Sequence, residues 1–107
     1  MEMLKSVRHD NIIQYFGSFI ESDHLFILME YADVGDLLSL LKKQKVKKRH
    51  FAELELWNIS FQIASALLHL HSNNIIHRDI KCLNVFLTSS NRIKVSLFLL
   101  VVASLVI

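Results

Sequence analysis

Residues 77–84 read His-Arg-Asp-Ile-Lys-Cys-Leu-Asn, and this octapeptide decides how the rest of the chain is interpreted. It places a carboxylate, a lysine and a carboxamide close together, at Asp79, Lys81 and Asn84. A carboxylate can accept a proton from a reacting hydroxyl, and a carboxamide oxygen suits a hard cation such as Mg²⁺. Because the octapeptide lies between a long apolar-periodic segment and two short apolar runs, we expect it to form a loop between a helix and a hairpin.

The segment upstream of the loop begins with two apolar runs, residues 11–20 and 25–31. Residues 21–23 (Glu-Ser-Asp) are a turn signal between them, so the pattern predicts a strand hairpin. Leucine-rich residues 37–42 follow Gly35-Asp36, with an acid at the start and a lysine at the end. That charge order suits the helix dipole and predicts a short helix.

A long helix is predicted from a series of apolar residues at three- and four-residue steps. The series comprises Leu54, Trp57, Phe61, Ala64 and Leu68, with Ile63, Leu67 and Leu70 beside it. These positions form a wide apolar stripe on a helix of about 19 residues, so we expect the stripe to be buried against several partners. Ser72-Asn73-Asn74 should end the helix, because asparagine tolerates the left-handed conformation common at helix ends.

After the loop, residues 85–88 and 93–95 predict a second hairpin, with residues 89–91 as its turn. The predicted fold class is therefore α+β. The chain ends in thirteen uncharged residues, 95–107. A membrane-spanning helix needs about 20 apolar residues, so this run predicts a buried strand or helix, or a sticky tail, with a membrane anchor as the weaker alternative.

Composition limits the class of protein. At 107 residues the chain is one small domain, and its single cysteine, Cys82, excludes internal disulfides and suits a reducing, cytoplasmic setting. We expect no signal peptide, because residues 1–11 are charged and lack an apolar stretch. Residues 42–49 carry six bases and no acid. This run could be a nuclear-localisation or nucleic-acid patch, but a solvated helix end is the better interpretation, so no nucleic-acid partner is predicted.

The octapeptide in its helix–loop–strand setting resembles the catalytic loop of eukaryotic protein kinases. Residues 30–37 (EYADVGDL) and 77–88 (HRDIKCLNVFLT) are closer still to the NIMA-related serine/threonine kinases. The resemblance implies a partial kinase domain over residues 1–96, with residues 97–107 as an apolar tail unlike a kinase. It would hold the end of the N-lobe sheet, the hinge, the first C-lobe helices and the catalytic-loop hairpin. The implied activity is ATP-dependent phosphorylation of serine or threonine hydroxyls in protein substrates.

The resemblance also implies roles for three residues of the loop. Asp79 is similar to the catalytic base that orients and deprotonates the substrate hydroxyl. Lys81 resembles the lysine that serine/threonine kinases direct at the γ-phosphate, and Asn84 resembles the Mg²⁺ ligand. His77 and Arg78 would support this loop.

Five further residues resemble the family's ATP site. Met29 sits at the gatekeeper position, and the backbone of Glu30 and Ala32 would bind adenine through hydrogen bonds. Asp36 lies where an acid contacts the ribose, and Phe86 would form part of the floor beneath the adenine ring. ATP and Mg²⁺ are therefore the expected cofactors.

Three departures from the family pattern bear on activity. The only glycines, Gly17 and Gly35, exclude a Gly-rich phosphate loop, and the family's lysine and helix-C glutamate are expected upstream of Met1. Leu97-Phe98-Leu99 stands where Asp-Phe-Gly is expected. Because phosphoryl transfer depends on positioning and charge stabilisation, we expect no appreciable kinase activity from this chain alone. The alternatives are a non-catalytic, protein-binding kinase fragment and, less favoured, a basic peptide that associates with membranes. Exposed apolar surface would also favour self-association.

Overall fold

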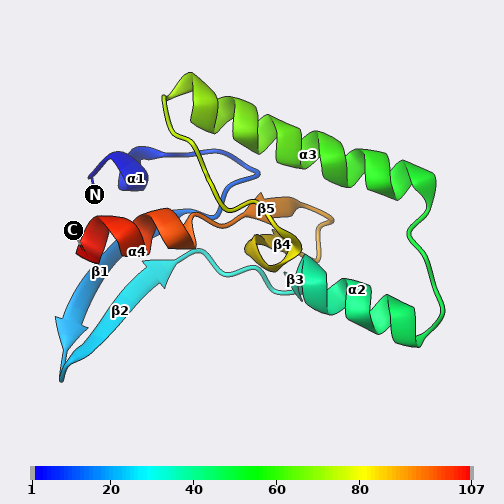
Figure 1. Cartoon of the computed structure of the whole chain (residues 1–107), viewed down its shortest axis with the longest axis horizontal. Helices are drawn as coiled ribbons and strands as arrows, with labels where there is room; N and C mark the ends of the chain where they lie inside the picture. Colours follow the sequence, from blue (N-terminus) through cyan, green and yellow to red (C-terminus); the bar gives the residue numbers. More distant parts are fainter. Residues whose placement is uncertain (1, 107) are drawn as a thin grey trace.

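The computed structural model describes residues 2–106, and its elements follow the predicted order (Figure 1). Met1 and Ile107, the outermost residues of the predicted kinase part and the predicted tail, lie outside the described residues. Two small antiparallel sheets and several helices make an α+β fold, as predicted. In chain order the elements are α1 (Glu2–Ser6), β1 (Tyr15–Glu21), β2 (His24–Met29), β3 (Gly35–Asp36), α2 (Leu37–Val46), α3 (Glu53–Ser72), the 3-10 turn η1 (Cys82–Asn84), β4 (Val85–Leu87), β5 (Ile93–Val95) and α4 (Phe98–Val106).

The predicted first hairpin is confirmed as β1 paired antiparallel with β2, although β1 begins at Tyr15 and not at residue 11 as predicted. Its turn is Ser22-Asp23, and both residues have positive φ, at 51° and 61°. Two consecutive positive φ angles match the mirror-image turns that join tightly twisted strands. The hairpin projects from the rest of the molecule (Figure 1), and most of its large apolar side chains are exposed.

The second sheet has the order β3-β4-β5 and includes the predicted second hairpin. β3 pairs with β4 through Gly35 opposite Leu87 and Asp36 opposite Phe86. The segment before β1 joins the free side of β5, because Ile13 N donates to Val95 O and Val95 N donates to Asn11 O. This small sheet therefore connects the hairpin segment, α2 and the loop region.

Asp36 begins α2 as its N-cap, and its carboxylate accepts from Ser39 N at 2.8 Å. The helix runs to Val46, four residues further than predicted, so the first lysines of the basic run lie on its last turns. All six bases of residues 42–49 are exposed, and none forms an ion pair within the described part of the chain. The expectation of a solvated helix end agrees with this exposure.

The predicted length of the long helix is confirmed by α3, but the predicted burial of its main apolar series is wrong. Leu54, Trp57, Phe61, Ala64 and Leu68 are exposed. The face that packs toward β5 carries the fully buried Ala66 and Leu70 with half-buried Ile63 beside them, so of the predicted stripe only its margin, at Ile63 and Leu70, is packed. Both faces of this helix carry large apolar residues, so periodicity could not select between them. Ala66 allows close approach to the sheet, which Trp57 and Phe61 would prevent. Asn74, at φ 60°, reverses the chain after α3 as expected.

The main core lies between α1, the start of β1, α3 and α4. Its buried members are Leu4, Val7, Ile12, Tyr15, Ala66, Leu70, Ile75, Val95, Leu97 and Val101. Residues 98–106 therefore form a helix whose Val101 side chain is fully buried, rather than a strand or a free tail. Among the described residues, no helix is both long enough and apolar enough to cross a membrane.

Candidate active site

The loop after α3 is held by the buried His77 side chain. Its Nδ1 accepts from Asp79 N at 3.1 Å, which places the ring proton on Nε2. Nε2 lies 2.6 Å from Ser96 O and donates to it. The ring is 2% exposed, so water does not compete for either bond. His77 therefore fixes the loop against the segment that leads into α4.

Arg78 turns the loop sharply, with φ at 70°. The left-handed region is uncommon for a residue with a side chain and costs about 1–3 kcal/mol. The turn leaves Arg78 exposed while His77 is buried and Asp79 is half-buried. The loop thus separates an inward histidine from an outward arginine within two residues.

Asp79, Lys81 and Asn84 are brought together as the octapeptide suggested. Asn84 Nδ2 donates to Asp79 Oδ2 at 2.8 Å and to Asp79 O at 3.0 Å. Lys81 Nζ lies 3.6 Å from Asp79 Oδ1. The turn η1 makes this possible, because Asn84 N donates to Lys81 O and folds the chain back. The cluster is a half-buried carboxylate with one amide donor and one cation beside it.

Asn84 also determines how well the residues here fit Mg²⁺. Its Nδ2 is used by Asp79, so its Oδ1 is the atom left to meet a cation. Mg²⁺ needs octahedral oxygen ligands and usually one or two carboxylates. Leu97, which follows Ser96, is apolar and 1% exposed, and no cluster of three His, Cys, Asp or Glu suited to a metal occurs in residues 2–106. The side chains present therefore do not fit a complete Mg²⁺ site.

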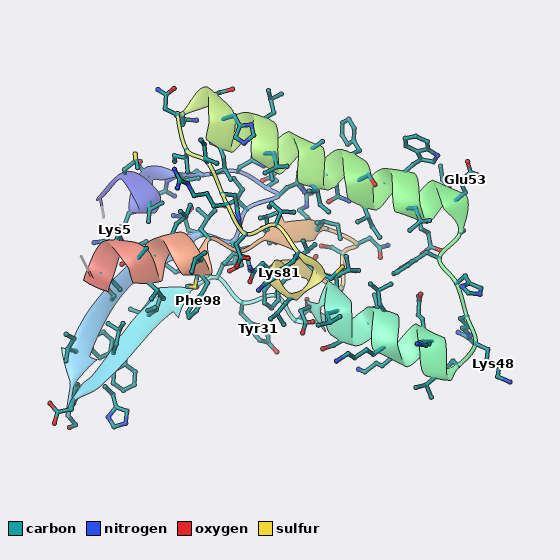
Figure 2. All side chains as sticks on the ribbon, viewed as in Figure 1. Lys5, Tyr31, Lys48, Glu53, Lys81 and Phe98 are labelled. Atoms are coloured by element: carbon teal, nitrogen blue, oxygen red, sulfur yellow. The ribbon has the colours of Figure 1, made fainter. Side chains whose placement is uncertain are left out.

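A cleft of about 590 Å³ opens beside this cluster. Four of the five residues predicted for nucleotide binding line it, namely Met29, Glu30, Ala32 and Phe86. The other lining residues are Ile13, Tyr31, Asp33, Val34, Gly35, Leu83, Asn84, Ser96 and Phe98. Tyr31 and Phe98, both labelled in Figure 2, are among these lining residues. Asn84 belongs to both the cleft and the polar cluster, so the two features form one site.

Asp36 is the predicted nucleotide ligand that does not line the cleft. Its Oδ2 accepts from Ser39 N and its Oδ1 from Ser39 Oγ, both at 2.8 Å. The bonds from Ser39 lower the pKa of the Asp36 carboxyl below its ordinary value. In this structure the carboxylate therefore serves as the cap of α2.

The segment between β2 and β3 presents backbone groups to the cleft. Glu30 N donates to Gln14 O and Ala32 O accepts from Gly35 N, so these two groups are occupied. Glu30 O and Ala32 N have no hydrogen-bond partner among the described residues. The Glu30 carboxylate points away to Lys94, with Oε2 2.7 Å from Nζ. One acceptor and one donor two residues apart are thus free for a ligand.

Sequence reasoning missed Leu83, Val34 and Phe98 as cleft residues. Leu83 lies inside the octapeptide beside Asn84, so its apolar side chain was a usable signal. Phe98 begins α4, and the strand or helix expected within residues 95–107 carried no sign of where it would lie relative to the cleft.

Comparisons with known proteins agree with this arrangement. The family model for the protein kinase domain matches residues 1–102. The chain is 41% identical over 91 residues to the probable serine/threonine-protein kinase nek3 of Dictyostelium discoideum, covering 85% of the chain and 8% of that protein. It is 40% identical to Nek3 of Mus musculus, covering 90% and 18%, and 39% identical to an Aurora kinase of Yarrowia lipolytica, covering 92% and 25%. The chain thus spans a quarter or less of these relatives.

Proposed function

Because the chain belongs to the protein kinase family, we propose that its cleft binds the adenosine part of ATP and that residues 77–84 present a catalytic carboxylate to serine or threonine hydroxyls. The predicted resemblance to NIMA-related kinases is confirmed by the matched relatives, which include several Nek proteins. Protein kinases use ATP and Mg²⁺ in general. For this chain, protein substrates and a cytoplasmic setting remain part of the proposal.

The observation that carries the proposal is the convergence of Asp79, Lys81 and Asn84 beside an apolar cleft. A hydroxyl placed at Asp79 would find a carboxylate acceptor already oriented by the Asn84 amide. Lys81, 3.6 Å from the same carboxylate, would add positive charge where a phosphoryl group arrives. This arrangement supports the proposed roles of Asp79 as base, Lys81 as phosphate contact and Asn84 as support.

Adenine fits the cleft by shape and by hydrogen bonding. Its amino group would donate to Glu30 O, and a ring nitrogen would accept from Ala32 N. Met29 and Phe86 supply apolar surface for the two faces and the edge of a planar ring. When bound, ATP would supply the phosphoryl group that is transferred.

We further propose that this chain by itself transfers no phosphoryl groups at an appreciable rate. Asn84 offers a single oxygen to a cation, Leu97 supplies none, and residues 1–107 contain no Gly-rich loop. Electrostatic stabilisation of the phosphoryl group is the main catalytic term in this reaction. Radiolabelled phosphate transfer by the chain should equal that of the Asp79→Ala variant, and transfer above that control would contradict the proposal.

Nucleoside binding is tested separately from catalysis. With ¹⁵N-labelled chain, titration of adenosine should shift the Ala32 amide resonance, because Ala32 N–H would gain an acceptor. The Phe86→Ala variant should weaken binding about tenfold by removing apolar contact. Phe61→Ala is the matched control, because Phe61 is an exposed phenylalanine outside the cleft. An unmoved Ala32 resonance, or equal affinities for both variants, would refute the proposed orientation of adenine.

A second candidate function is protein binding without catalysis. The exposed apolar side chains of the β1–β2 hairpin favour it, since exposed apolar patches mark interaction surfaces. Failure to bind any nucleotide, together with retained binding of a defined protein partner, would support this alternative.

A further inference from the structure

The outward face of α3 carries four large apolar side chains that nothing in residues 2–106 covers. Leu54, Trp57, Phe61 and Leu68 are 80%, 67%, 74% and 69% exposed. At 100° per residue they fall within a sector of about 60° along the helix. We call these four residues the α3 stripe. Figure 1 shows α3 along one edge of the molecule, with the other elements on one side of it.

The α3 stripe is symmetric about Phe61. Leu54 and Leu68 each lie seven residues from Phe61, on opposite sides along the chain. Trp57 lies four residues before Phe61, and the small, exposed Ala64 lies three residues after it. If a second α3 runs antiparallel across a two-fold axis at Phe61, Leu54 meets Leu68 and Trp57 meets Ala64. Large side chains then face small ones, and leucine faces leucine.

The charges beside the α3 stripe favour the same direction. Glu53 and His71 are eighteen residues apart, which is five turns, so they lie on one line along the helix. Both are exposed, and Glu53 Oε1 also accepts from Trp57 Nε1 at 3.4 Å. Figure 2 labels Glu53 at the end of α3 that the connection from α2 enters. In the antiparallel arrangement each Glu53 lies on the same side of the interface as His71 of the other copy, within about two residues' rise along the helix, whereas in parallel helices the two positions would lie at opposite ends.

We propose that α3 is a self-association surface on which a second copy of this chain docks antiparallel, with the two-fold axis at Phe61. An aromatic side chain buries about 150–250 Å², so the two stripes together remove on the order of 1,000 Å² from water. That area is the lower limit for a specific interface, so the dimer is weak and reversible. The two-fold symmetry of the stripe and the Glu53–His71 pairing select a second copy over an unrelated partner.

The β1–β2 hairpin is the competing surface, because it also exposes apolar side chains. Ile20 on the hairpin is 76% exposed, nearly the same as Phe61. Sedimentation velocity of the full chain should show a reversible dimer. Phe61→Ser should weaken this dimer at least about tenfold, while Ile20→Ser should leave it unchanged. The reverse result would place self-association on the hairpin, and a chain that stays monomeric at high concentration would overturn the proposal.

Direction and register need a second experiment, with Cys82→Ser as the background so that no native thiol remains. Leu54→Cys mixed with Leu68→Cys should form a disulfide between copies under mild oxidation. Either variant alone should not, because equivalent positions lie about 21 Å apart in the antiparallel pair. Disulfides formed by each variant alone, with no mixed disulfide between Leu54→Cys and Leu68→Cys in the mixture, would show parallel helices and refute the proposal.

The charge pairing is tested by reversal. His71→Glu should weaken the dimer, because the new carboxylate would meet Glu53 of the other copy. Adding Glu53→Lys should restore it, since each introduced ammonium group would then face an introduced carboxylate across the interface. Both positions are exposed, so neither change should disturb folding. If the double variant associates no better than His71→Glu alone, the proposed register is wrong.

Discussion

The side-chain nitrogen of Asn84 donates to both the carboxylate and the backbone carbonyl of Asp79, at 2.8 Å and 3.0 Å. One amide group therefore fixes the χ angles of Asp79 and the turn that carries it. The backbone carbonyl of Asn84 also accepts from Ser96 N at 2.8 Å, which joins the loop to the start of the α4 segment. Asn84 is thus a structural centre of the loop as well as a cleft residue.

Asn84→Ala should destabilise the chain by about 1–3 kcal/mol, because it leaves the Asp79 carbonyl and carboxylate without their donor. Urea denaturation gives the free energy of unfolding, and hydrogen exchange at the Asp79 amide reports on the loop itself. Asn58→Ala is the matched control, since Asn58 is exposed and forms no side-chain hydrogen bond within residues 2–106. Equal stability of the two variants would show that Asn84 does not hold the loop.

ATP should bind this chain no more tightly than adenosine. The lining residues include Asp33 and Glu30, whose carboxylate is paired with Lys94, and no lysine or arginine among the described residues. The negative charge of the triphosphate therefore meets no cationic side chain inside the cleft and adds no favourable electrostatic energy to binding. Calorimetric titration at moderate salt compares the two ligands directly. A clear preference for ATP would mean that cations outside the cleft reach the phosphates, and loss of that preference in Lys81→Ala would identify one.

Lys94→Met should cost about 1–3 kcal/mol, because it leaves the Glu30 carboxylate without its cation. The Lys94 and Glu30 side chains are 12% and 30% exposed, and their charged atoms lie 2.7 Å apart. The control is Arg92→Met, at the residue just before β5, the strand that contains Lys94. Arg92 pairs with the largely exposed Asp10, so its loss should cost about 0.5 kcal/mol or less. Urea midpoints that shift equally for both variants would contradict this ranking.

Stability should fall as the pH drops below about 6.5, and His9 should be one cause. Burial lowers the pKa of His9 from its ordinary value of 6.5, and the nearby His69 lowers it further. Lys94 acts in the same direction and Asp10 in the opposite one. A depressed histidine pKa means that the unfolded chain binds the proton first, so this contribution to stability is full above about 6.5 and is lost as the pH falls.

His9 Nδ1 accepts from Asn11 N at 2.9 Å, and protonation there would break this bond. His9→Asn keeps a hydrogen-bond acceptor but cannot be protonated, so its stability should change less between about pH 7 and pH 5. Thermal denaturation across that interval measures the difference. Parallel curves for the parent and the variant would assign the acid sensitivity to other histidines.

Val101→Ala should destabilise the chain by about 2 kcal/mol, since it opens a cavity in the main core. Leu99→Ala removes more carbon atoms, but Leu99 is partly exposed and should cost less. If the larger loss follows Leu99→Ala, α4 does not pack as described. The result also bears on the prediction that residues 97–107 form a separate tail.

Local patterns predicted most of the elements. The hairpins, the turn at Ser22-Asp23 and the end of α3 at Asn73-Asn74 depend on backbone preferences of adjacent residues, which the sequence displays. The Asp79–Lys81–Asn84 cluster is equally local, because η1 closes it within six residues. The resemblance of this loop to the kinase catalytic loop supplied the chemical roles expected of Asp79 and Lys81.

Tertiary choices were harder to predict. α3 carries apolar residues all round, so the packed face depends on which side lets the sheet approach. The side with the small Ala66 allows a closer approach than the side with the large Trp57, and it is the side that is buried. Asp36 offered both a ribose contact and a helix cap, and only the structure shows that it is used as the cap. The position of Phe98 at the cleft depends on α4, for which the motif gave no information.

The pairing of β3 with β4 has a consequence for how a ligand is admitted. Val34 N donates to Leu87 O, and Ser89 N donates to Asp33 Oδ1. These hydrogen bonds hold the segment that carries the Ala32 N–H against β4, the strand that carries Phe86. These bonds hold two of the segments that line the cleft in a fixed relation before any ligand arrives. A ligand therefore meets a wall that is already formed, and its binding loses little entropy in ordering this part of the protein.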